Sequence, residues 1–121
     1  MNINNQLIDY LDSIASKSDL HYLKMAAIVI KNRKPVYGLF GYNYHITPGR
    51  SKYSIHAEED LLIRAAKMGY KMQGATVVIY RSNYHGLAIS KPCKQCEHKL
   101  RKAGVRNVIY FQDGWLKERY T

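Results

Sequence analysis

Ser54-Ile55-His56-Ala57-Glu58 opens one helical pattern of this chain, and Lys91-Pro92-Cys93-Lys94-Gln95-Cys96 opens a second one. Between the two helices lies Ala75 to Tyr80, an apolar run rich in β-branched residues that predicts a buried strand. A strand pattern also precedes the first helix, and another follows the second, so the centre of the chain reads as βαβαβ. Such a unit predicts parallel strands joined by right-handed crossovers, with the helices packed on a sheet.

The segments before this centre predict a helix and a hairpin. Apolar residues recur at helical spacing over about residues 3–16, which predicts an amphipathic helix. Met25–Ile30 and Val36–Gly41 are apolar runs on either side of the turn residues 32–35, and they predict two antiparallel strands. Residues 42–53 read as a loop.

Caps and turns bound the central elements. Ser54 is expected to cap the first central helix, and Gly69 lies where a C-terminal cap glycine belongs. Residues 81–91 read as a long connection, and Cys93–Ala103 is the second central helix, which Gly104 ends.

The C-terminal residues predict a hairpin. Val105–Phe111 and Trp115–Tyr120 are strand patterns, and Asp113-Gly114 between them is a tight-turn signal. A parallel connection needs about a dozen residues or more, so we expect the last strand to run antiparallel to the strand before it. The element order is therefore αββαβαββ, which predicts a single α/β domain over residues 1–121.

Composition indicates a globular protein with an affinity for polyanions. The chain has 121 residues, of which 46% are hydrophobic, and this suits one domain with a core. Its start lacks the basic and apolar regions of a signal peptide, and no apolar run has transmembrane length. We therefore expect a cytoplasmic or nuclear protein that does not insert into a membrane. The net charge of +10 favours nucleic acids, nucleotides or acidic lipids as partners.

The only two cysteines and His56 form a candidate zinc site. Zinc prefers thiolate and imidazole ligands, and catalytic sites use three protein ligands and keep a fourth position open. Cys93 and Cys96 are three apart at a helix start, so both side chains can point the same way. The sequence therefore predicts one Zn²⁺ held by His56, Cys93 and Cys96.

Glu58 is the candidate proton carrier beside that metal. A carboxylate at such a position can take a proton from water and return it to a reacting base. His56 and Glu58 are two apart and would face different ways on a regular helix, so the motif requires an irregular helix start. The backbone N–H of Ala57, between them, is expected to hold the carbonyl oxygen of the base. The combination of motifs is the pattern of zinc deaminases that act on cytosine or adenine.

Other interpretations account for part of this pattern. A lone Cys-x-x-Cys also occurs in dithiol redox proteins and in structural zinc sites, where His98 would be a rival ligand. Both leave His56-Ala57-Glu58 without a role. A non-catalytic, zinc-stabilised module that binds nucleic acid would share the zinc and the positive charge, and it stays the alternative to an enzyme.

The two motifs resemble the signature blocks of the cytidine deaminase superfamily, and Met25–Val29 and Gly41-Tyr42-Asn43 resemble its earlier blocks. The resemblance covers about residues 20–111. It implies a three-layer α/β fold with a five-stranded mixed sheet flanked by helices, one zinc per chain, Glu58 as the proton shuttle and hydrolytic loss of ammonia. It also implies that Asn43 binds the sugar, that Tyr22 packs against the base, and that the chain forms a homo-oligomer.

Departures from the family pattern bear on the substrate. Free-nucleoside cytidine deaminases usually have cysteine where His56 stands, and a ribose-binding glutamate where His45 stands. Together with the charge, these differences favour a nucleotide or a single-stranded nucleic acid. The antiparallel C-terminal hairpin instead resembles nucleoside deaminases and related toxin-like deaminases. The sequence thus predicts a zinc-dependent hydrolytic deaminase that converts a cytosine-type base to uracil, on a nucleoside, a nucleotide or single-stranded nucleic acid.

Overall fold

The central sheet of this protein is covered on both faces, because successive apolar side chains of a strand point to opposite sides. In the computed structural model, which describes residues 3–46 and 54–120, strand β1 spans Lys24–Lys31. Its residues Ala26 and Ile28 face one side of the sheet, and Ala27 and Val29 face the other. All four are at most 1% exposed, so β1 is buried on both faces.

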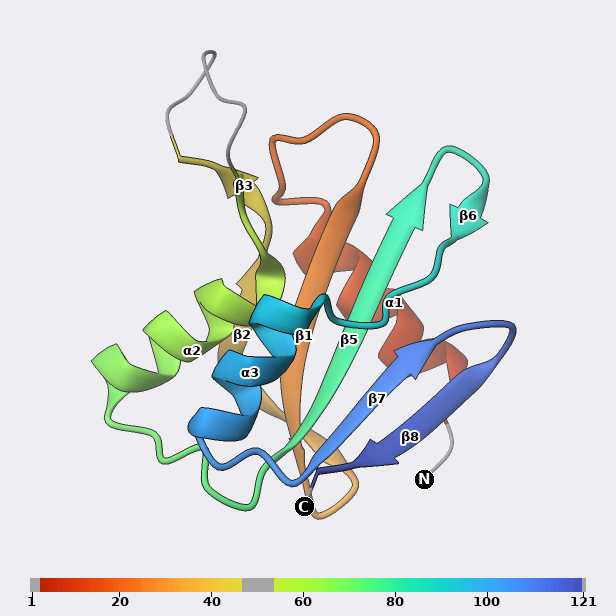
Figure 1. Cartoon of the computed structure of the whole chain (residues 1–121). Helices are drawn as coiled ribbons and strands as arrows, with labels where there is room; N and C mark the ends of the chain where they lie inside the picture. Colours follow the sequence, from red (N-terminus) through yellow and green to blue (C-terminus); the bar gives the residue numbers. More distant parts are fainter. Residues whose placement is uncertain (1–2, 47–53, 121) are drawn as a thin grey trace.

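The sheet has the strand order β2-β1-β5-β7-β8 (Figure 1). Strand β1 runs antiparallel to both of its neighbours, β5 is parallel to β7, and β7 is antiparallel to β8. A short strand β6 (Gly86–Leu87) pairs with β5 and makes the sheet six-stranded. The other four strands span Lys34–Tyr42 (β2), Thr76–Asn83 (β5), Asn107–Phe111 (β7) and Trp115–Arg119 (β8).

Three helices complete a three-layer α/β fold. Helix α1 (Asn5–Ala15) packs on one face of the sheet through Leu7, Leu11 and Ile14. Helices α2 (Ala57–Met68) and α3 (Lys94–Lys102) cover the other face. In Figure 1, α1 lies behind the sheet and α2 and α3 lie in front of it. The predicted mixed sheet between helices is therefore confirmed, as is the C-terminal hairpin.

The sequence prediction was wrong at two boundaries. Ser54 does not cap α2, because Ser54–Ile55 pairs as strand β4 with strand β3 (Tyr44–His45) and His56 becomes the N-cap. Strand β5 does not end at Tyr80, because its last residues pair with β6 in a hairpin. The C-terminal cap of α2 is as predicted, since Gly69 has a φ of 70°. The predicted loop 42–53 was also wrong in part, because Tyr42 ends β2 and Tyr44–His45 forms β3; residues 47–53 lie outside the described residues.

The strand directions bring both central helix starts to one edge of the sheet. The start of β1 and the ends of β2, β5 and β7 lie at this edge, which is uppermost in Figure 1 and which we call the upper edge. Helices α2 and α3 follow chain segments that leave this edge, so their N-termini lie there too. Within the described ranges, no helix is both long and apolar enough to cross a membrane.

Alkaline pH is expected to destabilise the fold partly through Tyr80. Its side chain is 5% exposed, and its hydroxyl donates to Asp12 Oδ1 over 2.8 Å. Burial and then this hydrogen bond raise the pKa of Tyr80 from 10.0 to about 12. The unfolded chain therefore ionises first, so the contribution is complete below about pH 10 and is lost as pH approaches about 12. At about 1.4 kcal/mol per pH unit, the loss is about 2–3 kcal/mol.

Urea denaturation of the wild type and Tyr80→Phe at several pH values between about pH 8 and about pH 12 measures this contribution. The variant should start less stable, because it lacks the hydrogen bond, and should lose stability less steeply with pH. Identical slopes for the two proteins would show that Tyr80 ionisation does not contribute.

Candidate metal and catalytic site

His56 is positioned by the end of one element and the start of another. It follows β4 and is the N-cap of α2, with the extended angles φ −80° and ψ 156°. Its side chain therefore leaves the chain before the helical twist begins, while Glu58 lies within the first turn. This is the irregular helix start that the spacing of the two residues requires.

Three side chains meet in a group that can bind a metal ion. One donor atom each of His56, Cys93 and Cys96 lies within 4.8 Å of the others. His56 Nδ1 is 3.8 Å from Cys93 Sγ and 3.4 Å from Cys96 Sγ. Tetrahedral zinc at its usual bond lengths holds such donors about 3.5 Å apart, so the spacing fits one ion. The rival ligand His98 is exposed and is outside this group.

Glu58 is a buried carboxylate with an unsatisfied oxygen. The residue is 1% exposed, and its Oε1 has no hydrogen-bond partner among the described residues. Burial raises the pKa of Glu58 above its ordinary value. Burial, followed by the charge of Glu58, also raises the pKa of the Cys96 thiol. A divalent cation offsets both effects, because it attracts the carboxylate and displaces the thiol proton. The donor set and the buried acid therefore both fit zinc.

Gly41 on β2 fixes how closely α2 approaches the sheet. A Cβ atom at this position would collide with the carbonyl oxygen of Ala57 and the backbone nitrogen of Leu61, and would lie 2.9 Å from Leu61 Cα. The helix start therefore sits directly on the strand, with His56 just beyond the contact. Sequence reasoning missed this role, although an isolated glycine in a strand pattern is the signal for a close backbone approach.

Glu59 links the two ligand-bearing helices. Its Oε1 accepts from the backbone N–H of His56 at 3.5 Å, and its Oε2 accepts from Lys99 Nζ at 2.7 Å. Lys99 lies one turn after Cys96 on α3, so one carboxylate joins both halves of the site. An exposed ion pair of this kind contributes about 0–1 kcal/mol.

Comparison with known proteins places this site in a family. Residues 1–112 match the model of the cytidine and deoxycytidylate deaminase zinc-binding region. The chain belongs to this family. The match spans all three candidate ligands and Glu58, so the candidate zinc site lies in the region that the family model describes.

Relatives of this deaminase-family chain are distant. ComE operon protein 2 of Bacillus subtilis (strain 168) is 26% identical over 113 residues, which are 83% of this chain and 54% of that protein. The chain thus spans about half the length of that relative.

Solved structures share the fold at low identity. The cytidine deaminase from Burkholderia pseudomallei has a TM-score of 0.70 at 16% identity, covering 98% of this chain and 93% of its own. The dCMP deaminase from cyanophage S-TIM5 in apo form has a TM-score of 0.65 at 20% identity, covering 88% and 82%.

The structure locates the three predicted substrate-binding residues of this deaminase-family chain at the upper edge. Ala57 is the first residue of α2 and is 0% exposed; amides of a first turn have no intrahelical acceptor. Asn43 is 4% exposed, and its side chain donates to Leu23 O and accepts from Met25 N, both at 2.8 Å. Tyr22 is 71% exposed, with its ring edge-to-face on Tyr84. Their roles toward base and sugar stay predictions.

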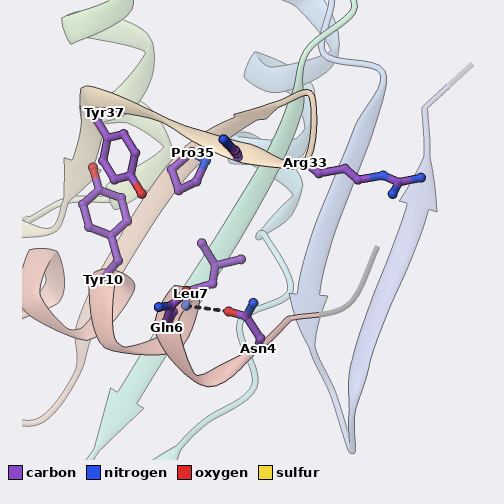
Figure 2. A pocket seen from close by; sticks show the side chains of 8 residues that line it. Asn4, Gln6, Leu7, Tyr10, Arg33, Pro35 and Tyr37 are labelled. Carbon is purple, nitrogen blue, oxygen red and sulfur yellow. Dashed lines mark hydrogen bonds between the residues drawn. The ribbon is translucent and has the colours of Figure 1, made fainter.

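A cavity formed by the described residues lies away from this site (Figure 2). Its volume is about 680 Å³, and its walls come from the start of α1 and from the hairpin between β1 and β2, at the lower edge. Tyr10 and Tyr37 meet edge-to-face in its wall, with ring centroids 5.2 Å apart. No residue of the metal-binding group lines it, so the donor geometry rather than the hollow identifies the site.

Proposed function

We propose that this chain is a zinc-dependent hydrolytic deaminase that converts the cytosine base of a nucleoside or nucleotide to uracil. The observation that carries the proposal is Glu58, a buried acid with a free oxygen beside a group of three zinc-type ligands. Zinc held by His56, Cys93 and Cys96 would supply Lewis acidity toward water and the substrate. The net reaction adds one water to the cytosine and releases one ammonia.

Glu58 carries the protons in this proposal. Its carboxylate takes a proton from the attacking water and delivers it to the ring nitrogen of the base; a second transfer protonates the leaving amine. Burial suits this work, because it keeps bulk water away from the carboxylate, so its free oxygen can exchange protons with the substrate. The Ala57 amide is oriented by the helix start and is assigned to the base carbonyl oxygen.

Burial of Glu58 also argues against the non-catalytic alternative. A module that only binds nucleic acid through a zinc-stabilised fold gains nothing from a carboxylate oxygen without a partner, and such a group costs stability. A dithiol redox site would likewise give no role to the buried carboxylate of Glu58.

A substrate panel tests the proposal. Zinc-loaded protein is incubated with cytidine, deoxycytidine, CMP, dCMP and a short cytosine-containing oligonucleotide, and products are read by mass. We expect a gain of about one dalton, the difference between NH and O, with one ammonia released per turnover. The Glu58→Ala protein is the control and should form no product. Zinc-loaded protein that leaves every cytosine compound unchanged would contradict the proposed function.

A further inference from the structure

The register of the sheet defines a row of residues beneath the start of α2, the helix that begins after His56. Ala27 on β1 lies opposite Gly41 on β2 and opposite Ile79 on β5. Ala27 and Ile79 belong to the core on the side of α2 and α3, and Gly41 touches Ala57 and Leu61. We call these three strand residues the inner row. The start of α2 lies directly over Gly41 in this row.

A second row lies closer to the upper edge on the same face of the sheet. Met25 and Arg81 are paired across β1 and β5, two residues beyond Ala27 and Ile79. Side chains two apart on a strand face the same side, so both point toward the side of α2 and α3. Met25 packs against that core, which agrees with this assignment. Arg81 therefore lies one row closer to the upper edge than the strand residues beneath the start of α2.

The segment that leads to the cysteines runs back beside Arg81. The backbone N–H of Ala88 donates to Arg81 O at 2.9 Å, and Ser90 Oγ donates to Ile79 O at 2.8 Å. Cys93 follows three residues after Ser90 and begins α3. The chain thus passes Arg81 immediately before it supplies two of the three metal ligands.

Arg81 has an unsatisfied group at this position. Its Nε is buried without a hydrogen-bond partner, and no ion pair of Arg81 occurs among the residues described. Arg64 by contrast donates to Asp60 at 2.8 Å, and Arg101 pairs with Glu97. A buried N–H without an acceptor is costly, so the Nε of Arg81 points to a ligand.

We propose that Arg81 binds a phosphate group of the substrate and so directs the enzyme to phosphorylated cytosine compounds rather than free nucleosides. This proposal rests on the proposed deaminase function. The planar guanidinium group binds two phosphate oxygens through two parallel hydrogen bonds. A neutral base or sugar has no pair of charged oxygens that fits this geometry. The net charge of +10 raises the local concentration of such substrates. The 5′-phosphate of a mononucleotide and the backbone phosphate of a single strand share this chemistry.

Two variants of Arg81 separate charge from packing. Arg81→Met keeps an apolar stem of similar size and removes the charge, while Arg81→Lys keeps the charge and loses the planar guanidinium group. The matched control is Arg33→Met, which removes an exposed arginine in the hairpin turn at the lower edge. The measurement is kcat/KM for cytidine, CMP, dCMP and a short single-stranded oligonucleotide.

The wild type should prefer its phosphorylated substrate over cytidine by about 10-fold to 100-fold, the size of a hydrogen bond to a charged group. Arg81→Met should lose about that factor on the phosphorylated substrate and change less than about twofold on cytidine. Arg81→Lys should fall in between, and Arg33→Met should match the wild type. The mononucleotide and oligonucleotide arms identify which phosphate is bound.

Three results would overturn the proposal: a wild type that prefers cytidine, equal losses on cytidine and CMP in Arg81→Met, or the same loss in Arg33→Met. If no compound is deaminated, the proposed function fails, and Arg81 is then judged by calorimetric binding of CMP and cytidine to the zinc-loaded protein. Tighter binding of CMP that disappears in Arg81→Met supports the phosphate site, and equal affinities overturn it.

Discussion

Replacing Glu58 by glutamine is expected to lower kcat by about 10²–10⁴-fold, the range for loss of a general acid–base group. Glutamine has the same shape and leaves the core filled, but it cannot accept and return a proton. The buried carboxylate has an oxygen without a partner, so its loss should not lower the midpoint of urea denaturation. Single-turnover deamination, zinc content and urea denaturation measured on one preparation test all three expectations.

Glu59→Gln is the matched control for this experiment. Glu59 is the next carboxylate along α2, but its side chain is 24% exposed and is paired with Lys99 rather than unsatisfied. Its removal should change kcat by less than about tenfold, because it supports the helix start and carries no proton. If Glu58→Gln with full zinc content kept more than about a tenth of wild-type kcat, proton transfer would have to be reassigned to another group.

Replacing Gly41 by alanine is expected to cost about 3 kcal/mol of stability or more and to weaken zinc binding. The added Cβ would meet backbone atoms of Ala57 and Leu61, which cannot turn aside as a side chain can. Helix α2 must therefore shift away from β2, and His56 at its start moves with it. Urea denaturation of the zinc-loaded protein and competition for zinc with a colorimetric chelator give the two quantities.

Gly38→Ala separates this effect from ordinary glycine loss on the same strand. Gly38 has a φ of +86°, and an added Cβ would have no heavy atom within 4 Å. The substitution should cost about 1 kcal/mol through backbone strain and leave zinc affinity unchanged. Equal zinc affinity in the Gly41→Ala protein would show that the helix start adapts without displacing His56.

The sequence predicts correctly those boundaries that depend on the backbone conformation of one or two residues. Gly69 after Met68 and the Asp113-Gly114 turn are backbone positions that few other residues occupy, and both mark the boundaries found in the structure. The sequence predicts helices that open after Ser54 and at Cys93, and the structure begins α2 at Ala57 and α3 at Lys94.

The errors have tertiary causes. Ser54 is a good capping residue, but pairing with Tyr44–His45 draws it into a strand, and the cap falls to His56. Strand β6 has only two residues and no pattern of its own, and it exists because β5 extends past Tyr80 to meet it. The local sequence of Ser54 or of β5 does not indicate which segment each one pairs with.

The candidate metal ligands could be predicted better than the candidate substrate contacts. Zinc in proteins is bound by few types of side chain, chiefly cysteine and histidine. The chain has only two cysteines, so Cys93 and Cys96 are easily recognised, and the His-x-Glu motif adds His56. Substrate contacts depend on which polar groups have no hydrogen-bond partner after folding. Tertiary packing decides which groups these are, so a sequence motif does not reveal them. Asn43 uses its side chain to hold the backbone around Met25, while Arg81, which no motif marks, is left with a free donor.

The antiparallel pairing of β1 with β5 has a consequence for the order of folding. The hairpins β1–β2 and β7–β8 join strands close in sequence and can form early, whereas β1 and β5 are separated by β2, all of α2 and their loops. Closing that long loop carries the main entropic cost. Helix α2, which begins after His56, packs on β2 and β1, whereas both cysteines follow β5, so we expect the three candidate ligands to meet only after β1 and β5 have paired. We therefore expect zinc capture to follow the rate-limiting step and to slow unfolding rather than speed folding.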